Sequence, residues 1–499
     1  MKTVGLVVGN LGGKVLGLVR EVLLAYFFGA TAAADAFRAS LTAALVPTHF
    51  FMGDVLEGAF VPLYVRRRLE DPAAAARLLG LVSLYLLVVS SGVAALLWVA
   101  GDSVVRVVAP GLAPGTVAVA GRIARWMALG IPLYCFAHLT ALRGLIVGRG
   151  RALALRSPAF NAAFVVAIPA AAAIHDPQWI GLGFSVAAAS YCGYAWWEVR
   201  LASGSAASYG WVPGAGEGKL IAGAALPLVG MMVLGQLLAL VDRMAASFAG
   251  VGSLASLEYA RTFVETPQVL LGAAMATTSL STFAGMSEGQ VRRSVGEYVL
   301  PILTGSLAFL LALAVTAPEI VAIVYQRGQF DARAAKLVTS VVRGMAIGGA
   351  FSMAAYVMIR VLSARLRSRE AVPPMAAAIA TAALGNVIMV PRLGILGVAL
   401  ATSAGQLVMC CLVAWRLGVA ADMRRRVPGW ALGAILVAGL GAGGTMVGGS
   451  PWVRAVLLGT GTLAAFVAGC ALTAETRADL GVLRAHLARL VRGLRRTAT

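Results

Sequence analysis

The chain has 499 residues, of which 60% are hydrophobic and only 12% are charged, and its mean hydropathy is +0.86. Because apolar runs of about 20 residues match a hydrocarbon layer of about 30 Å, this composition excludes an ordinary soluble domain and predicts an all-α polytopic membrane protein. A net charge of +20 would favour nucleic acid as a partner in a soluble protein, but here the arginines concentrate in loops, so no nucleic-acid partner is expected.

The first apolar stretch, residues 4–65, is predicted to form a helical hairpin with a turn near residues 30–34. A charge at the centre of a spanning helix costs roughly 2.5–3.5 kcal/mol on insertion scales, so charged side chains here must face protein or water. The hairpin carries Lys14, Arg20, Glu21, Asp35, Arg38, Asp54 and Glu57. These charges predict an internal polar cavity.

Three glycines and an arginine share one face of the first predicted helix. At about 100° per residue, Gly9, Gly13, Gly17 and Arg20 fall on a narrow face, while Lys14 points about a quarter turn away. One interpretation is that the glycine groove leaves space beside the cation. The other is that it lets a second helix pack closely.

Counting apolar runs between charges, glycines and prolines predicts fourteen membrane helices. They are placed at residues 3–29, 35–64, 78–100, 117–142, 157–174, 178–198, 219–247, 256–283, 298–324, 337–360, 372–391, 394–416, 428–447 and 452–473. Prolines at Pro47 and Pro267, the latter near Glu265, predict kinks in the second and eighth helices.

The arginines of alternate loops predict the orientation. The positive-inside rule places both termini in the cytoplasm, because these loops then carry most of the positive charge. The inside loops contain Arg66, Arg67, Arg68, Arg77, Arg149, Arg151, Arg156, Arg200, Lys219, Arg292, Arg293, Arg365, Arg367, Arg369, Arg424, Arg425 and Arg426. The scattered outside exceptions are Arg106, Arg327, Arg333, Lys336, Arg392 and Arg454.

A weak internal repeat indicates two related lobes. Residues 27–38 and 247–261 are similar, and Asp35-x-x-Arg38 matches Glu258-x-x-Arg261 in spacing, with each pair on one helical face. We expect an N-lobe at 1–217, a C-lobe at 218–420, two further helices at 421–474 and a tail at 475–499. The tail is predicted to be a basic amphipathic helix on the cytoplasmic phospholipid surface or a solvated terminal helix.

The charges toward the outer half of the membrane suggest a gate between the lobes. We expect Arg20 and Arg38 to meet Glu258 or Asp242, and Asp35 to meet Arg261, with Arg243 and Glu265 beside them. Static structural ion pairs are the alternative interpretation.

The cations of the cavity are candidates for binding an anionic substrate. Lys14, Arg20, Arg38 and Arg261 offer ammonium and guanidinium donors that suit phosphate. Asp54 and Glu57, three residues apart, could take a proton, bond sugar and peptide groups, or lie toward the inner interface. Asp242, Asn386 and Thr402 could form an oxygen-ligand cation site, although such Asn and Thr residues usually bond between helices.

Catalytic and metal-binding motifs are absent from the sequence, so neither an enzyme nor a cofactor is expected. The four histidines, His49, His138, His175 and His486, are scattered and are interpreted as packing or interface residues. Transport would draw on a Na⁺ or H⁺ gradient, the membrane potential or the substrate's own gradient.

Five segments occur in order along both predicted lobes: Gly17–Phe37, Glu57–Tyr64, Tyr259–Pro267, Val324–Phe330 and Pro391–Ser403. Together they resemble the MurJ/MviN family, the lipid II flippases of bacterial cell-wall synthesis. The resemblance implies the fold of the multidrug/oligosaccharidyl-lipid/polysaccharide exporter superfamily, with two six-helix lobes and two extra helices that form a lipid-tail groove.

The resemblance also implies cavity and gate roles for Arg20 and Asp35, which match family positions. Lys14 stands where the family usually has arginine. Met52 and Gly53 replace a common basic pair, and Thr262 replaces an arginine, with Arg261 displaced by one position. The implied activity is flipping of an undecaprenyl-pyrophosphate-linked precursor by a monomer, near cell-wall synthesis enzymes. The departures leave another lipid-linked glycan open, a small-cation drug antiporter is less favoured, and a non-transporting scaffold is the alternative of a different class.

Overall fold

The computed structural model describes residues 2–52, 56–203, 217–265, 283, 286–365, 367–443 and 448–497. The described residues are almost entirely helical and contain no β-strand, which confirms the all-α class. The chain divides into two compact units. Unit 1 is Met1–Ala255 with Arg327–Asp331, and unit 2 is Ser256–Gln326 with Ala332–Thr499. The predicted lobe boundaries stay a prediction.

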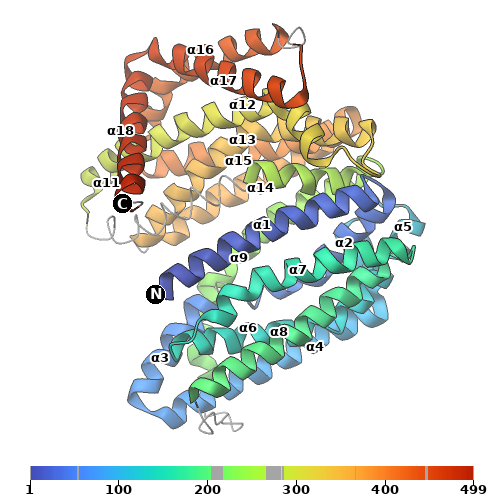
Figure 1. Ribbon diagram of the computed structural model, residues 1–499. Coiled ribbons are helices and arrows are strands. Elements are labelled where there is room, and N and C mark those ends of the chain that lie inside the picture. Colours follow the sequence, from blue (N-terminus) through green and yellow to red (C-terminus); the bar gives the residue numbers. More distant parts are fainter. Residues whose placement is uncertain are drawn as a thin grey trace. The chain divides into compact units, whose positions relative to one another are not determined.

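Unit 1 holds the N-terminal helices, and α1 runs alongside α7 in it (Figure 1). Its elements are α1 (Lys2–Phe28), α2 (Ala32–His49), the π-helical turn η1 (Leu56–Phe60), α3 (Val61–Glu70), α4 (Pro72–Val108), α5 (Pro114–Ala128), α6 (Ile131–Ile146), α7 (Arg151–Ala173), α8 (Gln178–Ser203) and α9 (Glu217–Phe248). Residues 253–265 are also helical and run from unit 1 into unit 2.

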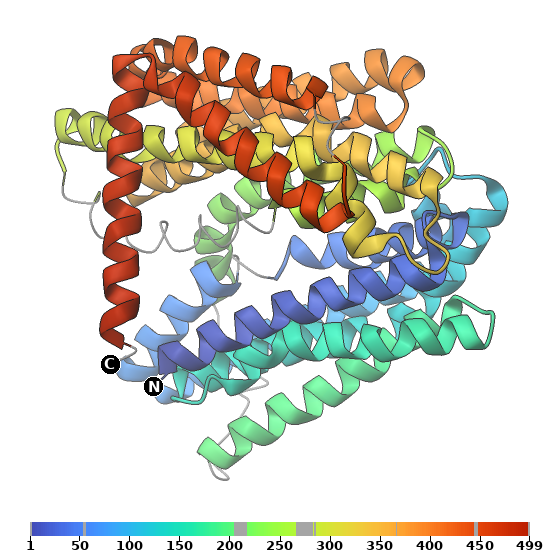
Figure 2. The ribbon, with the colours of Figure 1, turned by 45° about the horizontal axis from the view of Figure 1, so that its top comes forward.

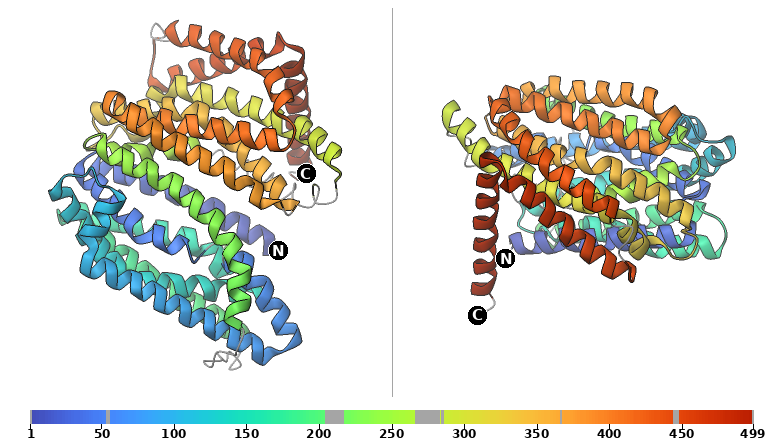
Figure 3. Two further views of the ribbon diagram at one scale, coloured as in Figure 1. Left: turned by 180° about the vertical axis from the view of Figure 1, so that it is seen from behind. Right: turned by 90° about the horizontal axis from the view of Figure 1, so that it is seen from above.

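Unit 2 holds the C-terminal helices. They are α11 (Glu288–Ser294), the π-helical turn η2 (Val295–Val299), α12 (Leu300–Tyr325), α13 (Ala332–Ala364), the 3₁₀ turn η3 (Ser368–Ala371), α14 (Val372–Leu393), α15 (Ile395–Arg416), α16 (Ala420–Gly443), α17 (Pro451–Ala471) and α18 (Ala474–Thr497). Helix α18 runs across the direction of α16 and α17 (Figure 2 and Figure 3). A helix that lies across membrane-spanning neighbours has the direction of a surface helix.

Within the described residues, seven helices are long and apolar enough to cross a membrane, or eight if the bent pair α5 and α6 is one span. The chain is therefore a polytopic membrane protein, and the count of fourteen spans stays a prediction. Asp54 and Pro267 lie outside the described residues.

Two predicted helices are divided. The helix expected at 35–64 ends at His49, where Pro47 lies in the last turn and the amides of Phe50 and Phe51 bond carbonyls only three residues back. The helix expected at 117–142 bends by 46° between α5 and α6, where Pro132 lacks the N–H that would continue the hydrogen-bond ladder. Prolines in the interior of the two predicted helices explain both breaks.

The turn between α1 and α2 brings distant segments of unit 1 together. Gly29 has φ +58° and packs directly against the backbone of Gln329, whose amide donates to the Tyr26 carbonyl at 2.8 Å. Gly252 has φ +83° and packs against the Ala30 backbone. A side chain at either glycine would be strained and would also meet backbone atoms, so glycine is required for this close approach.

Candidate functional site

The glycine face of α1 is filled by α7 in a regular register. A Cβ at Gly13 would lie 2.8 Å from Ser157 Cβ, and Asn161 Nδ2 donates to the Gly13 carbonyl at 3.0 Å. The contacts along this face pair Gly9 with Ala154, Gly13 with Ser157, Gly17 with Asn161 and Arg20 with Phe164. The helix-packing interpretation of the glycines is therefore confirmed, and the expected open space beside them is filled.

Where the glycines end, Arg20 stands over the Phe164 ring, 5.8 Å from its centroid. Its guanidinium also bonds the neighbouring Glu21, with Nη2 2.5 Å and Nε 3.2 Å from Oε1. The Arg20 side chain is 24% exposed, whereas that of Glu21 is 4% exposed. Arg20 is therefore held by a buried carboxylate and an aromatic face but keeps one side accessible.

Glu21 also binds Arg38 of α2. Arg38 Nη1 donates to Glu21 Oε1 at 3.2 Å, and Nη2 donates to Oε2. Arg38 is 5% exposed, so the bidentate pair is buried. Two guanidinium groups around one carboxylate give the cluster Arg20–Glu21–Arg38 a net charge of +1. This arrangement can attract an anion to the exposed side of Arg20.

Asp35 caps a helix. Its Oδ2 accepts from the Gly252 amide at 2.6 Å and its Oδ1 from the Ala255 amide at 2.8 Å, at the beginning of the helix at residues 253–265. The carboxylate is 1% exposed. Asp35 therefore satisfies helix N-terminal amides that would otherwise lose hydrogen bonds. Its expected pairing with Arg261 stays a prediction.

Arg261 and two acids share one face of the helix at residues 253–265. Arg261 Nη1 is 3.2 Å from Glu258 Oε1, and its Nε is 3.6 Å from Glu265 Oε1. The repeated acid-x-x-base pattern therefore has different partners in its two copies: Arg261 binds its own helix, and Arg38 binds the preceding helix. Thr262 donates to the Glu258 carbonyl of the same helix at 3.2 Å.

Glu57 lies near the buried His138, one of the histidines interpreted from the sequence as packing or interface residues. Glu57 Oε1 is 3.8 Å from His138 Nε2, and His138 Nδ1 is 3.0 Å from Arg156 Nη1. Because a guanidinium can only donate, Nδ1 accepts, and the proton of a neutral ring lies on Nε2, toward Glu57. This arrangement joins η1, α6 and α7 in unit 1.

The other predicted site residues are placed as follows. Lys14 is exposed on α1, and on α9 Asp242 is buried while Arg243 is partly exposed. In unit 2, Asn386 and Thr402 are buried on the adjacent helices α14 and α15, and Thr402 donates to the Val398 carbonyl of its own helix at 2.9 Å. No group of three His, Cys, Asp or Glu side chains in the described part of the chain could hold a metal. The cation site stays a prediction.

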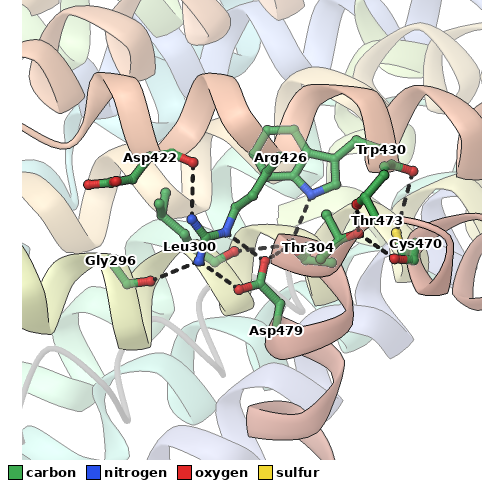
Figure 4. Close-up of polar contacts among 11 residues, drawn as sticks. Gly296, Leu300, Thr304, Asp422, Arg426, Trp430, Cys470, Thr473 and Asp479 are labelled. Atoms are coloured by element: carbon green, nitrogen blue, oxygen red, sulfur yellow. Dashed lines mark hydrogen bonds and ion pairs between the residues drawn. The ribbon is translucent and has the colours of Figure 1, made fainter.

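Unit 2 contains a second buried ionic cluster, at the base of α18 (Figure 4). Arg426 of α16 binds both carboxylate oxygens of Asp479 of α18, each at 2.8 Å. Thr304 of α12 donates to Asp479 at 2.8 Å and accepts from Trp430 Nε1 at 2.9 Å. This cluster fixes the start of the predicted amphipathic tail to α12 and α16.

The family model for lipid II flippase MurJ matches residues 24–431. The chain belongs to the MurJ family. The matched residues contain Asp35, Arg38 and the helix at residues 253–265, and they begin after Arg20 and Glu21. Helices α17 and α18 lie beyond the match.

Known proteins that are similar to this chain include one relative matched by sequence and two matched by fold. A protein of Thermotoga maritima described as a probable lipid II flippase MurJ is 24% identical over 415 residues, which are 81% of this chain and 82% of the relative. A solved lipid II flippase MurJ in an inward closed conformation matches with a TM-score of 0.77 at 16% identity, covering 92% of this chain and 97% of that one. An inward-facing MATE family multidrug resistance transporter of the MOP superfamily matches with a TM-score of 0.67 at 12% identity, covering 83% and 96%. The resemblance seen in the sequence is confirmed.

The sequence did not reveal that Glu21 is the shared partner of Arg20 and Arg38. Glu21 was counted among the charges of the hairpin but received no role, and Asn161 and Arg156 were not connected to α1 or His138. A signal for Glu21 exists in the sequence, because Arg20 and Arg38, two arginines in one apolar hairpin, require a nearby acid to reduce their burial cost.

Proposed function

We propose that this protein is a flippase that moves lipid II, the undecaprenyl-pyrophosphate-linked peptidoglycan precursor, across the cytoplasmic membrane by alternating access. Membership of the MurJ family supports the substrate class. The observation that carries the proposal is the cluster Arg20–Glu21–Arg38, which keeps a net positive charge and one accessible guanidinium among apolar helices. Such a charge at membrane depth is expensive and indicates a functional site.

Arg20 is the proposed first contact of the pyrophosphate. Its planar guanidinium can offer two parallel donors to phosphate oxygens, and Glu21 and Phe164 hold it in place before the substrate arrives. Lys14, exposed on the same helix, adds a point charge. Arg38 and Arg261 would complete the anion site, and the polyprenyl tail would stay in lipid.

The proposed cycle closes an outer gate in the inward-open state through Arg20 and Arg38 with Glu258 or Asp242, and through Asp35 with Arg261. Asp54, Glu57, Arg243 and Glu265 would line the cavity. A lipid II molecule would then meet the site from one side of the membrane at a time.

The proposed energy source is the membrane potential or a Na⁺ or H⁺ gradient, with Asp242, Asn386 and Thr402 as the coupling-ion site. Both termini would be cytoplasmic, as the arginine-rich loops indicate. Neither a cofactor nor catalysis by this chain is part of the proposal.

The test is rescue of bacteria depleted of their lipid II flippase, paired with a measurement of lipid II on the outer leaflet. The wild-type chain should restore growth and exposure of lipid II. Arg20→Gln should not restore growth when it is present in the membrane at the wild-type level. Arg66→Gln also removes one positive charge, but from an exposed side chain of α3, and it should restore growth as wild type does. Rescue by Arg20→Gln at the wild-type level would contradict the role of Arg20.

Another lipid-linked glycan is the second candidate substrate. Met52 is 2% exposed and Thr262 bonds its own helix, so neither supplies the basic group that the resemblance implies at these positions. Failure of well-expressed wild type in the rescue, with transport of a different lipid-linked glycan, would favour this candidate. Full function after neutralising both Arg20 and Asp35 would instead favour a scaffold.

A further inference from the structure

Unit 2 contains a pocket of about 540 Å³ at the junction of α12, α13, α15 and α17. Its polar side comes mainly from α13, and its apolar floor comes from α12 and α15. The lining residues are Pro318, Ala322, Gln326, Ala335, Lys336, Thr339, Ser340, Arg343, Leu396 and Arg454. None of them belongs to the proposed lipid II site.

Three cations from two distant parts of the sequence meet in this pocket. Lys336 and Arg343 are seven residues apart on α13 and therefore share one helical face, on which Ser340 also lies. Arg454 comes from the first turn of α17. In the sequence, Lys336 and Arg454 were exceptions to the positive-inside pattern, and Arg343 lies inside a predicted span. The tertiary structure gathers these three cations at one place.

The pocket keeps a positive charge after its internal contacts are counted. Arg454 Nε is 3.7 Å from Oε1 of Glu319, a side chain that is 10% exposed. Arg343 Nε donates to the Ala314 carbonyl at 3.2 Å. Because a carbonyl is neutral, this bond does not neutralise the charge of Arg343. Three cations and one carboxylate leave a net charge of +2. An exposed arginine on a spanning helix is costly unless water or an anion accompanies it.

The chemistry of the lining fits a phosphate group attached to an apolar body. Guanidinium and ammonium groups bind phosphate oxygens, and Ser340 Oγ, which donates to the Leu337 carbonyl, can still accept a hydrogen bond. Pro318, Ala322 and Leu396 offer an apolar wall that a free inorganic ion would not use. Basic pockets between membrane helices bind anionic lipid head groups in this way.

We propose that this pocket binds the phosphate of an anionic phospholipid head group. The predicted orientation places it on the extracytoplasmic side of the membrane, so its lipid would belong to the outer leaflet. The pocket shares no lining residue with the proposed lipid II site.

The test compares two double variants of the full-length protein in detergent. Lys336→Gln with Arg343→Gln removes two pocket cations and leaves Arg454 to balance Glu319. Arg333→Gln with Arg392→Gln removes two exposed cations from α13 and α14 that do not line the pocket. Binding of phosphatidylglycerol and of zwitterionic phosphatidylcholine is measured by native mass spectrometry, and inorganic phosphate and pyrophosphate are added as competitors.

We expect the pocket variant to bind phosphatidylglycerol about tenfold or more weakly than wild type, and the control variant to bind it as wild type does. Phosphatidylcholine should bind weakly to all three proteins. Equal phosphatidylglycerol affinity in the two double variants would overturn the proposal. Pocket-dependent binding of inorganic phosphate or pyrophosphate without binding of phosphatidylglycerol would also overturn it, because the phosphate would then come from solution.

Discussion

Arg38 of α2 donates to both carboxylate oxygens of Glu21 of α1. The same carboxylate also accepts from Arg20, so one acid holds two guanidinium groups and joins the two arms of the first hairpin. A buried ion pair contributes little net stability, because desolvation offsets its Coulomb energy. Its value here is that it holds Arg20 in one position with an accessible side.

Removing the charge of Glu21 should leave two buried cations without their counter-ion. We expect Glu21→Gln to lower the free energy of unfolding by about 3–5 kcal/mol, because the remaining guanidinium groups stay desolvated and repel each other. The measurement is the thermal midpoint in detergent. Glu70→Gln, which breaks the exposed pair with Arg66, is the control and should leave the midpoint unchanged. An unchanged midpoint for Glu21→Gln would show that Glu21 does not hold the cluster.

Adding a methyl group to α1 should change stability differently on its α7-facing side and on its opposite side. Gly13→Ala places a Cβ 2.8 Å from Ser157 Cβ on α7, so we expect a loss of about 1–3 kcal/mol from overpacking. The matched control is Gly12→Ala, because its new Cβ would have no atom of another helix within 4 Å. This control should be neutral or stabilising by up to about 1 kcal/mol, since alanine favours a helix over glycine. Equal stability of the two variants would contradict the α1–α7 register.

Asp35 should protect the amides that it caps. We expect Asp35→Ala to cost about 1–2 kcal/mol and to speed hydrogen exchange at Gly252 and Ala255, because both amides lose their acceptor. Asp35→Asn keeps one acceptor oxygen and should give an intermediate exchange rate. Transport measured on the same variants separates capping from gating. If the gate depends on the negative charge of Asp35, both Asp35→Ala and Asp35→Asn should lose transport, even where Asp35→Asn slows hydrogen exchange of the two amides.

The Arg426–Asp479 pair should control the attachment of α18. We expect Asp479→Ala to lower stability by about 3–5 kcal/mol and to make α18 sensitive to protease, because Arg426 and Thr304 lose a buried partner. Arg484→Gln, on the exposed part of the same helix, is the control for a general change in the tail. Protease resistance of α18 in Asp479→Ala would show that its apolar contacts are sufficient.

Local sequence was sufficient for the helices and for the pattern of charged faces. Apolar runs predicted most of the long described helices, because each spanning helix must satisfy its own backbone hydrogen bonds. Prolines at Pro47 and Pro132 explain where two of these helices break. The spacing of Glu258 and Arg261 predicted a pair on one face, since this contact lies within one helix.

The sequence by itself determined the all-α membrane class, the resemblance to the MurJ family and the charged hairpin with its candidate cations. Only the tertiary structure decided that Glu21 serves both Arg20 and Arg38, that α7 fills the glycine face, and that Lys336, Arg343 and Arg454 share a pocket. The physical reason is the distance along the sequence over which each feature is set. The period of apolar residues and the spacing of charges on a helix depend on residues close together in the sequence. The partner of a buried charge depends on which helices pack together.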